Sequence, residues 1–231
     1  METLKFSTRN KKLMELASHS GKRVVAFNLP AGHTCPAASL CLAKADRITG
    51  KLSYGKDCKF TCYAALTECV FPNTRKAVWY NYDLLSGKSA DSMAELIIKS
   101  MPNKTDIVRI HSDGDFFSRK YFKAWQIVTA ELSNIIFFGY TKVLPYVIAD
   151  KSHNFYLQYS WGGLFDEESI ALKVPTAYVR TNPTEYVGIQ TVCASHSMGH
   201  EDYYKILAGE SFAINVHSGV IASAKARKKT K

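Results

Sequence analysis

The chain has 231 residues, of which 46% are hydrophobic and 22% charged, as in an ordinary globular domain. This composition excludes a disordered tail protein, a collagen-like fibre and a small disulfide-stapled scaffold. The formal net charge is +10, and such an excess favours polyanionic partners, above all nucleic acid. Part of the excess lies in a basic tail, residues 224–231, which holds Lys225, Arg227, Lys228, Lys229 and Lys231.

We expect no signal for export or membrane insertion in this chain. No apolar run approaches the roughly 18 residues of a membrane span. Residues 1–23 are polar and basic and lack the apolar stretch of a secretory signal. We therefore expect a cytoplasmic protein with no membrane partner. Because the cytosol keeps thiols reduced, no disulfide partners are expected for the cysteines.

The first third of the chain contains two short elements and then a long segment without clear periodicity. Leu13, Met14 and Leu16 indicate a short amphipathic helix, and Val24 to Phe27 read as a buried strand. Residues 31–76 hold five of the six cysteines and show little periodicity. So long a stretch without elements is unusual in a compact domain unless function or a metal orders it. We expect this stretch to be a metal-binding segment.

The rest of the chain alternates between strands and helical or irregular segments. A helix is expected over about 89–100, and Ser118 can cap a second helix that carries Tyr121 and Trp125 on one face. Strands are expected over 107–111, 135–140, 154–160, 177–181, 190–193 and 211–217. This alternation predicts βαβ units around a parallel sheet.

We expect a single α/β domain over residues 1–231, built as a (β/α) barrel or partial barrel. A barrel is favoured over a Rossmann sheet because polar residues stand at many strand ends, and barrel enzymes place their sites on the rim where those ends converge. These residues are His111, Thr141, Lys142, Ser160, Arg180, Thr181, Cys193 and His217.

Clustered cysteines in a reduced compartment usually indicate a metal or catalysis. Their spacing is Cys35-x5-Cys41-x16-Cys58-x3-Cys62-x6-Cys69, with Cys193 far away. A zinc site normally shows paired C-x2-4-C knuckles, and only Cys58 and Cys62 fit that pattern. A [4Fe–4S] cluster accepts scattered thiolates and needs about four of them. The spacing favours an iron–sulfur cluster, with zinc as the alternative and buried small hydrophobes as a third explanation, most of all for Cys69.

Several ordered stretches of the chain resemble one family of phage proteins. They run from Leu29-Pro30-Ala31-Gly32-His33-Thr34-Cys35-Pro36 through Phe60-Thr61-Cys62-Tyr63 and Arg109-Ile110-His111-Ser112-Asp113-Gly114-Asp115 to Asn215-Val216-His217-Ser218-Gly219. Together they resemble the mycobacteriophage gene-product-eighty-eight family over about residues 25–220. The resemblance implies no particular activity, and if a phage encodes the protein, the cytoplasm in which we expect it is that of the infected host cell. It does imply a metal-ligand set of Cys35, Cys41, Cys62 and Cys193, with Cys58 as the rival fourth ligand.

A barrel-like protein with a cluster at its rim is also similar in outline to radical S-adenosylmethionine enzymes. Their C-x3-C-x2-C triplet is absent, since Cys58 and Cys62 supply the first spacing and position 65 is Ala65.

Further candidate residues follow the predicted strands. His111, Asp113 and Asp115 could serve acid–base chemistry or bind a metal, although the two carboxylates could equally satisfy backbone N–H groups in a turn. Lys142 is a candidate anion contact or a surface lysine. His196 and His200 could hold a metal if a helix placed them on one face, and His217 would face the rim of a barrel.

Arg75 and Lys76 adjoin aromatic residues and could contact single-stranded nucleic acid, together with Lys225, Arg227, Lys228 and Lys229 of the tail.

Three functions remain open from the sequence. The first is a phage iron–sulfur protein that binds nucleic acid (DNA or RNA) through its basic surface. The second is a redox or radical-type enzyme that uses His111, Asp113 and Lys142 as catalytic candidates beside the cluster. The third is a protein with a purely structural metal.

Overall fold

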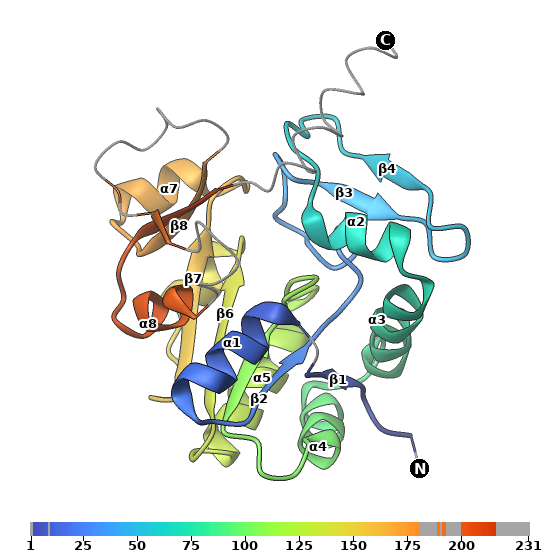
Figure 1. Ribbon diagram of the computed structural model, residues 1–231, viewed down its shortest axis with the longest axis vertical. Coiled ribbons are helices and arrows are strands. Elements are labelled where there is room, and N and C mark those ends of the chain that lie inside the picture. Colours follow the sequence, from blue (N-terminus) through green and yellow to red (C-terminus); the bar gives the residue numbers. More distant parts are fainter. Residues whose placement is uncertain (1, 9, 181–188, 190, 193–199, 216–231) are drawn as a thin grey trace.

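A computed structural model describes residues 2–8, 10–180, 189, 191–192 and 200–215. The part of the chain that it describes is α/β, with one large sheet and a small hairpin (Figure 1). The sheet strands are β1 (Phe6–Ser7), β2 (Val24–Phe27), β5 (Ile107–Ile110), β6 (Ile136–Thr141), β7 (Phe155–Ser160), β8 (Thr176–Arg180), β9 (Thr191–Val192) and β10 (Phe212–Asn215). The helices are α1 (Lys11–Ser20), α2 (Tyr63–Val70), α3 (Pro72–Leu85), α4 (Ala90–Ser100), α5 (Arg119–Glu131), α6 (Leu144–Ile148), α7 (Asp166–Ala171) and α8 (Glu201–Leu207).

The sheet is mostly parallel, as the strand–helix alternation predicts. Its order is β1-β2-β5-β6-β7-β8-β10-β9, and every pairing is parallel except that of β1 with β2. Successive strands β5, β6, β7 and β8 lie beside one another, so their carboxyl ends meet at one edge of the sheet. Among the described residues the pairings leave β1 and β9 as the two edges.

Helices cover both faces of the sheet, because the strand residues alternate between two hydrophobic clusters. Val25 and Phe27 pack with Trp125 of α5 in one cluster, which also includes side chains of α4. Val24 and Ala26 face the other way, into a cluster with residues of α1 and α8. This alternation is the period of two that a strand buried on both faces requires.

The 31–76 segment is more regular than we expected from its sequence. The absence of periodicity suggested an irregular stretch, but the segment contains the antiparallel pair β3 (Ala43–Ala45) and β4 (Leu52–Tyr54), all of α2 and the start of α3. The reason is length: strands of three residues are too short to show an alternating pattern. They are held by tertiary contacts, chiefly the packing of Ala43 with Ala31 and Ala64.

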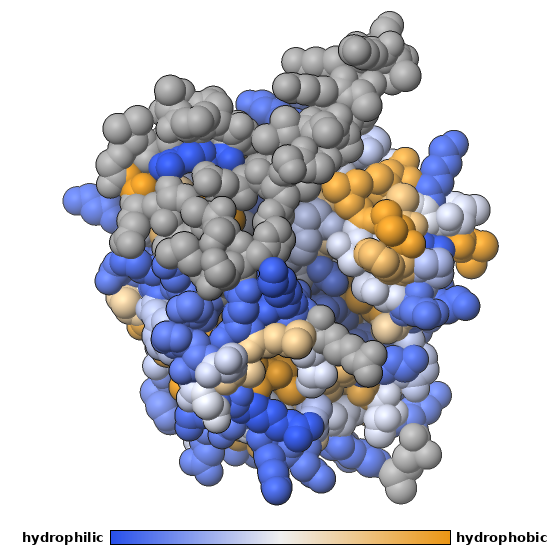
Figure 2. All heavy atoms as spheres, viewed as in Figure 1, coloured by the Kyte–Doolittle hydropathy of each residue, from blue (hydrophilic) through white to orange (hydrophobic). Residues whose placement is uncertain are grey.

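The hairpin region also carries exposed apolar side chains. Hydrophobic atoms gather at the upper right of Figure 2, over the area of β3, β4 and α2. Exposed apolar residues of these elements and their connections are Ile48, Tyr54, Val70 and Phe71. Separately, none of the helices in the described ranges has the length and apolar character to cross a bilayer.

Candidate functional site

A cavity of about 370 Å³ lies at the carboxyl ends of the parallel strands. Its walls come from the segment after β2, from the ends of β5, β6 and β7, from the first residues of α1 and from α8. The volume is in the range of small-molecule sites, and the location is the usual one in α/β proteins. The residues that matter for its chemistry are Lys11, Lys12, Cys35, Cys41, Cys62, Arg109, His111, Ser112, Asp115, Lys142 and Asp202.

Three thiols converge on this cavity from positions far apart in the loop segment. Cys35, Cys41 and Cys62 all line it. They are near enough that the charges of Cys41 and Cys62 raise the pKa of the Cys35 thiol, and that of Cys41 raises the pKa of Cys62. Three of the four cysteines that the family resemblance implied as ligands therefore line one cavity.

Burial keeps the thiols of Cys35 and Cys62 protonated unless a cation compensates. Burial is the largest cause that raises the pKa of Cys35 well above its usual value, and it raises the pKa of Cys62 to about 12. Two backbone groups oppose this effect at Cys62. Because Cys62 directly precedes the first turn of α2, the N–H groups of Ala64 and Ala65 favour its thiolate and lower its pKa. A bound metal would displace the thiol protons, as thiolate ligation requires.

The loop that carries Cys35 is fixed from two sides. Gly32 has φ +72°, and a Cβ there would lie 2.2 Å from the carbonyl oxygen of Ala43, so only glycine fits beside the hairpin. The N–H of Gly32 then donates to Sγ of Cys35 at 3.3 Å. On the other side, the buried carboxyl group of Glu68 accepts from the N–H of Ala31 at 2.6 Å through one of its oxygens. The thiol of Cys35 is therefore held by a constrained backbone.

Cys58, Cys69 and Cys193 are not among the cysteines that the structure shows at the cavity. The thiol of Cys58 donates to the carbonyl oxygen of Phe60 at 3.2 Å, and neither Cys58 nor Cys69 lines the cavity. Cys193, the predicted fourth ligand, lies outside the described residues, as do His196 and His217. Within the described ranges, no three His, Cys, Asp or Glu side chains are grouped as they would be around a single metal ion. Cys35, Cys41, Cys62 and Cys69 are free thiols.

The turn after β5 leaves polar atoms unsatisfied beside the thiols. His111 has φ +64°, and its Nε2 lies 3.0 Å from the hydroxyl of Tyr121. Burial lowers the pKa of His111 to about 3, so the imidazole is neutral at pH 7. Nδ1 of His111 and Oγ of Ser112 are buried and have no hydrogen-bond partner among the described residues. Both residues line the cavity, where a ligand could satisfy them.

The two carboxylates of this turn have different roles. Asp115 accepts from the N–H groups of Phe116 at 2.7 Å and Lys142 at 3.0 Å, so it joins the turn to the end of β6. This is the structural alternative that the sequence left open. Burial raises the pKa of Asp113 to about 6, against the opposing effect of the Arg109 charge. Asp113 can therefore exchange a proton near neutral pH, whereas Asp115 is committed to the backbone.

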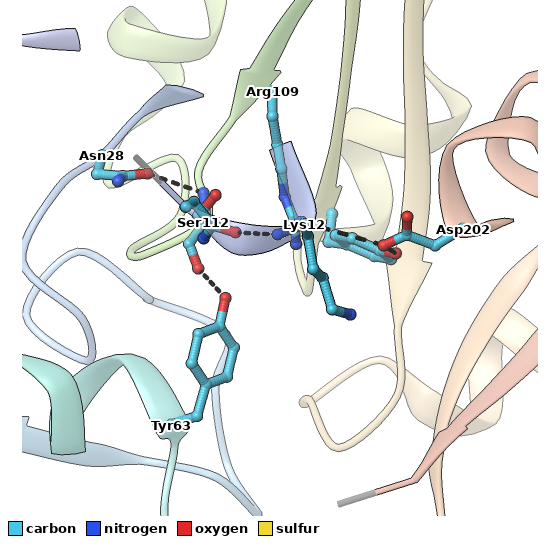
Figure 3. A network of polar contacts seen from close by, with 8 residues as sticks. Lys12, Asn28, Tyr63, Arg109, Ser112 and Asp202 are labelled. Atoms are coloured by element: carbon cyan, nitrogen blue, oxygen red, sulfur yellow. Dashed lines mark hydrogen bonds and ion pairs between the residues drawn. The ribbon is translucent and has the colours of Figure 1, made fainter. Parts of the chain in front are cut away.

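Arg109 and Asp202 form a buried charged pair that we did not select from the sequence (Figure 3). Nη1 of Arg109 lies 4.0 Å from Oδ2 of Asp202, and the hydroxyl of Tyr140 donates to that oxygen at 2.7 Å. The guanidinium lies over the Tyr140 ring, with 5.3 Å to the ring centroid. The available signal was a single charged residue in an otherwise apolar strand, Ile107-Val108-Arg109-Ile110.

The ammonium of Lys142 is held in place at the cavity wall. Its Nζ donates to the carbonyl oxygen of Ser160 at 3.0 Å, to the Ser160 hydroxyl at 3.1 Å and to the carbonyl oxygen of Trp161. The charge is thereby fixed at the end of β7 and is only partly available to a ligand.

The residues expected to contact nucleic acid do not form one surface in the described structure. Arg75 is buried, and its guanidinium donates to the carbonyl oxygens of Arg47, Ile48, Glu68 and Cys69. Lys76 is exposed on α3. Lys225, Arg227, Lys228 and Lys229 lie outside the described residues. His200, the remaining histidine candidate, stacks on His19 with 4.1 Å between ring centroids.

The comparisons with known proteins agree on one family. Its profile, described as Gene product 88, matches residues 3–228. The chain is 30% identical to the Gene 88 protein of Mycobacterium phage D29 over 115 residues, which are 45% of this chain and 48% of that protein. It is also 30% identical to the Gene 88 protein of Mycobacterium phage L5 over 95 residues, 37% of this chain and 40% of that protein.

These matches span about half, or less, of the length of the curated relatives. No solved structure matches the chain significantly. Because the family profile covers nearly the whole sequence, the chain belongs to the Gene product 88 family of phage proteins.

Proposed function

We propose that this protein holds an iron–sulfur cluster, of the [4Fe–4S] type, on Cys35, Cys41 and Cys62 at the cavity and acts there as a redox or radical-type enzyme. The observation that carries the proposal is the convergence of these three thiols on one cavity at the carboxyl ends of parallel strands. Sulfur donors of this kind suit iron–sulfur clusters and zinc. Cys193 is the proposed fourth ligand. A bound cluster would supply one-electron chemistry.

The open space beside the thiols favours an enzyme over a structural metal site. Structural sites enclose their metal completely, whereas catalytic sites leave room for substrate. Here the thiols face about 370 Å³ together with buried polar atoms of His111 and Ser112 that have no partner among the described residues. In this proposal those atoms orient a substrate, and the adjacent residue Asp113, which does not itself line the cavity and whose pKa burial raises to about 6, is the proposed proton carrier.

We further propose that the large sheet is a partial barrel. The parallel order from β2 through β10 and the cysteine segment that follows β2 support this proposal. The outline is similar to that of radical S-adenosylmethionine enzymes. The spacing Cys35-x5-Cys41-x20-Cys62 differs from their C-x3-C-x2-C triplet. The proposed reaction class therefore stays at redox or radical-type chemistry, without a named co-substrate.

Nucleic-acid binding has less support in this structure. The net charge of +10 favours it, but the guanidinium of Arg75 is occupied by backbone carbonyls inside the fold. The cavity is the better-built site.

The test is iron and sulfide analysis of protein purified without oxygen, for the wild type and for single Cys→Ser variants. We expect about four iron and four sulfide per chain in the wild type, with visible absorbance that dithionite bleaches. Cys35→Ser, Cys41→Ser and Cys62→Ser should each lose at least half of the iron.

Cys69→Ser is the matched control, because Cys69 lies on α2 and does not line the cavity. It should keep its iron. Wild-type protein without iron after reconstitution, or equal losses in Cys69→Ser and Cys62→Ser, would contradict the proposal. Thermal unfolding followed by circular dichroism distinguishes loss of the cluster from loss of the fold.

A further inference from the structure

We infer that the cavity has an anion-binding end formed by the N-terminus of α1 and Arg109, and that its substrate is a small organic molecule with a carboxylate or phosphate group. The inference deepens the proposed function by naming the substrate class, and it rests on that proposal only in treating the cavity as a reaction site. Its own evidence comes from α1 and β5.

The first observation is the position of the α1 N-terminus at the cavity. Asn10, Lys11 and Lys12 all line it. The side chain of Asn10 accepts from the N–H of Lys12 at 2.9 Å, which fixes the first turn of this ten-residue helix. The first turn contains no acidic residue, so the partial positive charge of the helix end is not neutralised locally.

The second, independent observation is Arg109. Its side chain is only 8% exposed, it lines the same cavity, and its Nε has no hydrogen-bond partner among the described residues. Burial opposes the charge of Arg109, but Tyr63 and Asp202 outweigh that effect and raise its pKa, so the guanidinium stays charged. An unsatisfied N–H of a buried guanidinium is a costly feature unless a ligand completes it.

The third observation is Lys12. Its side chain and that of Arg109 reach the cavity from different elements (Figure 3). Within the described ranges, the ammonium of Lys12 makes no hydrogen bond or ion pair, whereas that of Lys142 is held by Ser160 and Trp161. Lys12 is therefore free to pair with a ligand.

The balance of charge favours an anion rather than a cation. Four cationic side chains line the cavity, Lys11, Lys12, Arg109 and Lys142, against the carboxylates of Asp115 and Asp202. Asp115 is occupied by two backbone N–H groups, and Asp202 accepts from Tyr140 beside Arg109. The apolar wall formed by Ala177, Val179 and Ile214 would receive the uncharged body of the ligand.

The experiment compares probes of one shape and different charge. 1-Naphthoate, 1-naphthyl phosphate and the neutral 1-naphthamide are tested by equilibrium dialysis against protein purified without oxygen, with iron and sulfide measured in the same samples. We expect one site per chain that binds naphthoate or naphthyl phosphate at least ten-fold more tightly than naphthamide. The tighter of the two anions identifies the preferred group.

Lys12→Met should weaken binding of the preferred anion about ten-fold, equivalent to about 1.4 kcal/mol, and leave naphthamide binding unchanged. Lys22→Met is the matched control, because it removes the same charge from an exposed position just beyond the other end of α1. Arg109→Lys keeps the buried charge opposite Asp202 but removes the planar fork, and it should also weaken anion binding.

Equal binding of anionic and neutral probes would overturn the inference, as would equal effects of Lys12→Met and Lys22→Met, or no binding of either anion. The iron assay separates the two claims. Anion binding in protein that lacks iron would support this inference and contradict the proposed cluster. Protein with a full complement of iron and no preference for anions would support the proposed cluster and contradict this inference.

Discussion

The aromatic core and the cavity are built from the same strands, yet only the cavity presents unsatisfied polar groups to a possible ligand. In the core, Trp125 is fully buried against the rings of Phe27, Tyr121 and Phe137. At the carboxyl end of β5, Arg109, His111 and Ser112 each keep a buried polar atom without a partner among the described residues. Nε1 of Trp125 is likewise buried without a partner among the described residues, but Trp125 does not line the cavity, whereas the unsatisfied groups at the end of β5 do, where a ligand could reach them.

The largest expected effect is in the core. Trp125→Ala removes a fully buried side chain and should lower the free energy of unfolding by about 3–5 kcal/mol. Urea unfolding followed by circular dichroism measures it. A loss below about 1 kcal/mol would mean that this packing contributes little to stability.

The next effect tests Glu68, whose side chain accepts a hydrogen bond from the loop that carries Cys35. Burial raises the pKa of Glu68 from 4.5 to about 8, so the folded state holds a proton that the unfolded state releases. This contribution to stability is complete below about pH 4.5 and is lost as the pH rises towards 8. Each unit of raised pKa is worth about 1.4 kcal/mol, so we expect about 2–4 kcal/mol of stability to be lost between pH 5 and pH 8.

Glu68→Gln should remove that part of the pH dependence, because the amide oxygen can still accept from the N–H of Ala31. The melting temperatures of wild type and variant should be similar at pH 5 and should diverge at pH 8, with the variant higher. Glu95→Gln on exposed α4 surface is the control and should follow the wild type. Parallel pH profiles for the wild type and Glu68→Gln would be evidence against the raised pKa.

A smaller effect tests whether the conformation at Gly32 is needed to position Cys35, apart from its contribution to overall stability. Gly32→Ala introduces a Cβ at positive φ against the Ala43 carbonyl and should cost about 1–3 kcal/mol, with loss of iron through displacement of Cys35. Gly21→Ala is its matched control, since Gly21 also has positive φ but no atom within 4 Å of the new Cβ. The control should retain its iron. Equal iron content in both variants would break the link between Gly32 and the thiol site.

The smallest effect distinguishes the two carboxylates after β5. Asp115→Asn weakens two charge-assisted hydrogen bonds to backbone N–H groups and should cost about 1–2 kcal/mol. Asp113→Asn should leave the melting temperature within about 2 °C of the wild type, because an amide replaces a carboxyl that burial already disposes to neutrality. If Asp113→Asn were the more destabilising of the two, the assignment of their roles would have to be exchanged.

The sequence predicts the regular half of this molecule well. The spacing of Met93 and Ile97 gives α4, and the capping residue Ser118 gives the start of α5, because amphipathic helices carry their pattern in the local sequence. The mostly parallel sheet follows from the alternation of strands and helices. Cys35, Cys41 and Cys62 were also named from the sequence, through the family resemblance.

The cationic end of the cavity could not be predicted in the same way. Lys12, Arg109 and Asp202 come from α1, β5 and α8, and only tertiary structure brings them to one cavity. The positions of β3 and β4 depend similarly on the contact of Gly32 with Ala43, which no local pattern records. Sites assembled from distant elements require the fold before they can be recognised.

The most direct test of the proposed cluster is anomalous X-ray scattering at the iron edge, from crystals of protein purified and grown without oxygen. We predict a single strong iron peak per chain, within bonding distance of Cys35, Cys41 and Cys62 and beside the cavity at the carboxyl ends of the strands. Crystals with no iron peak, or with iron bound away from these three thiols, would contradict the central claim.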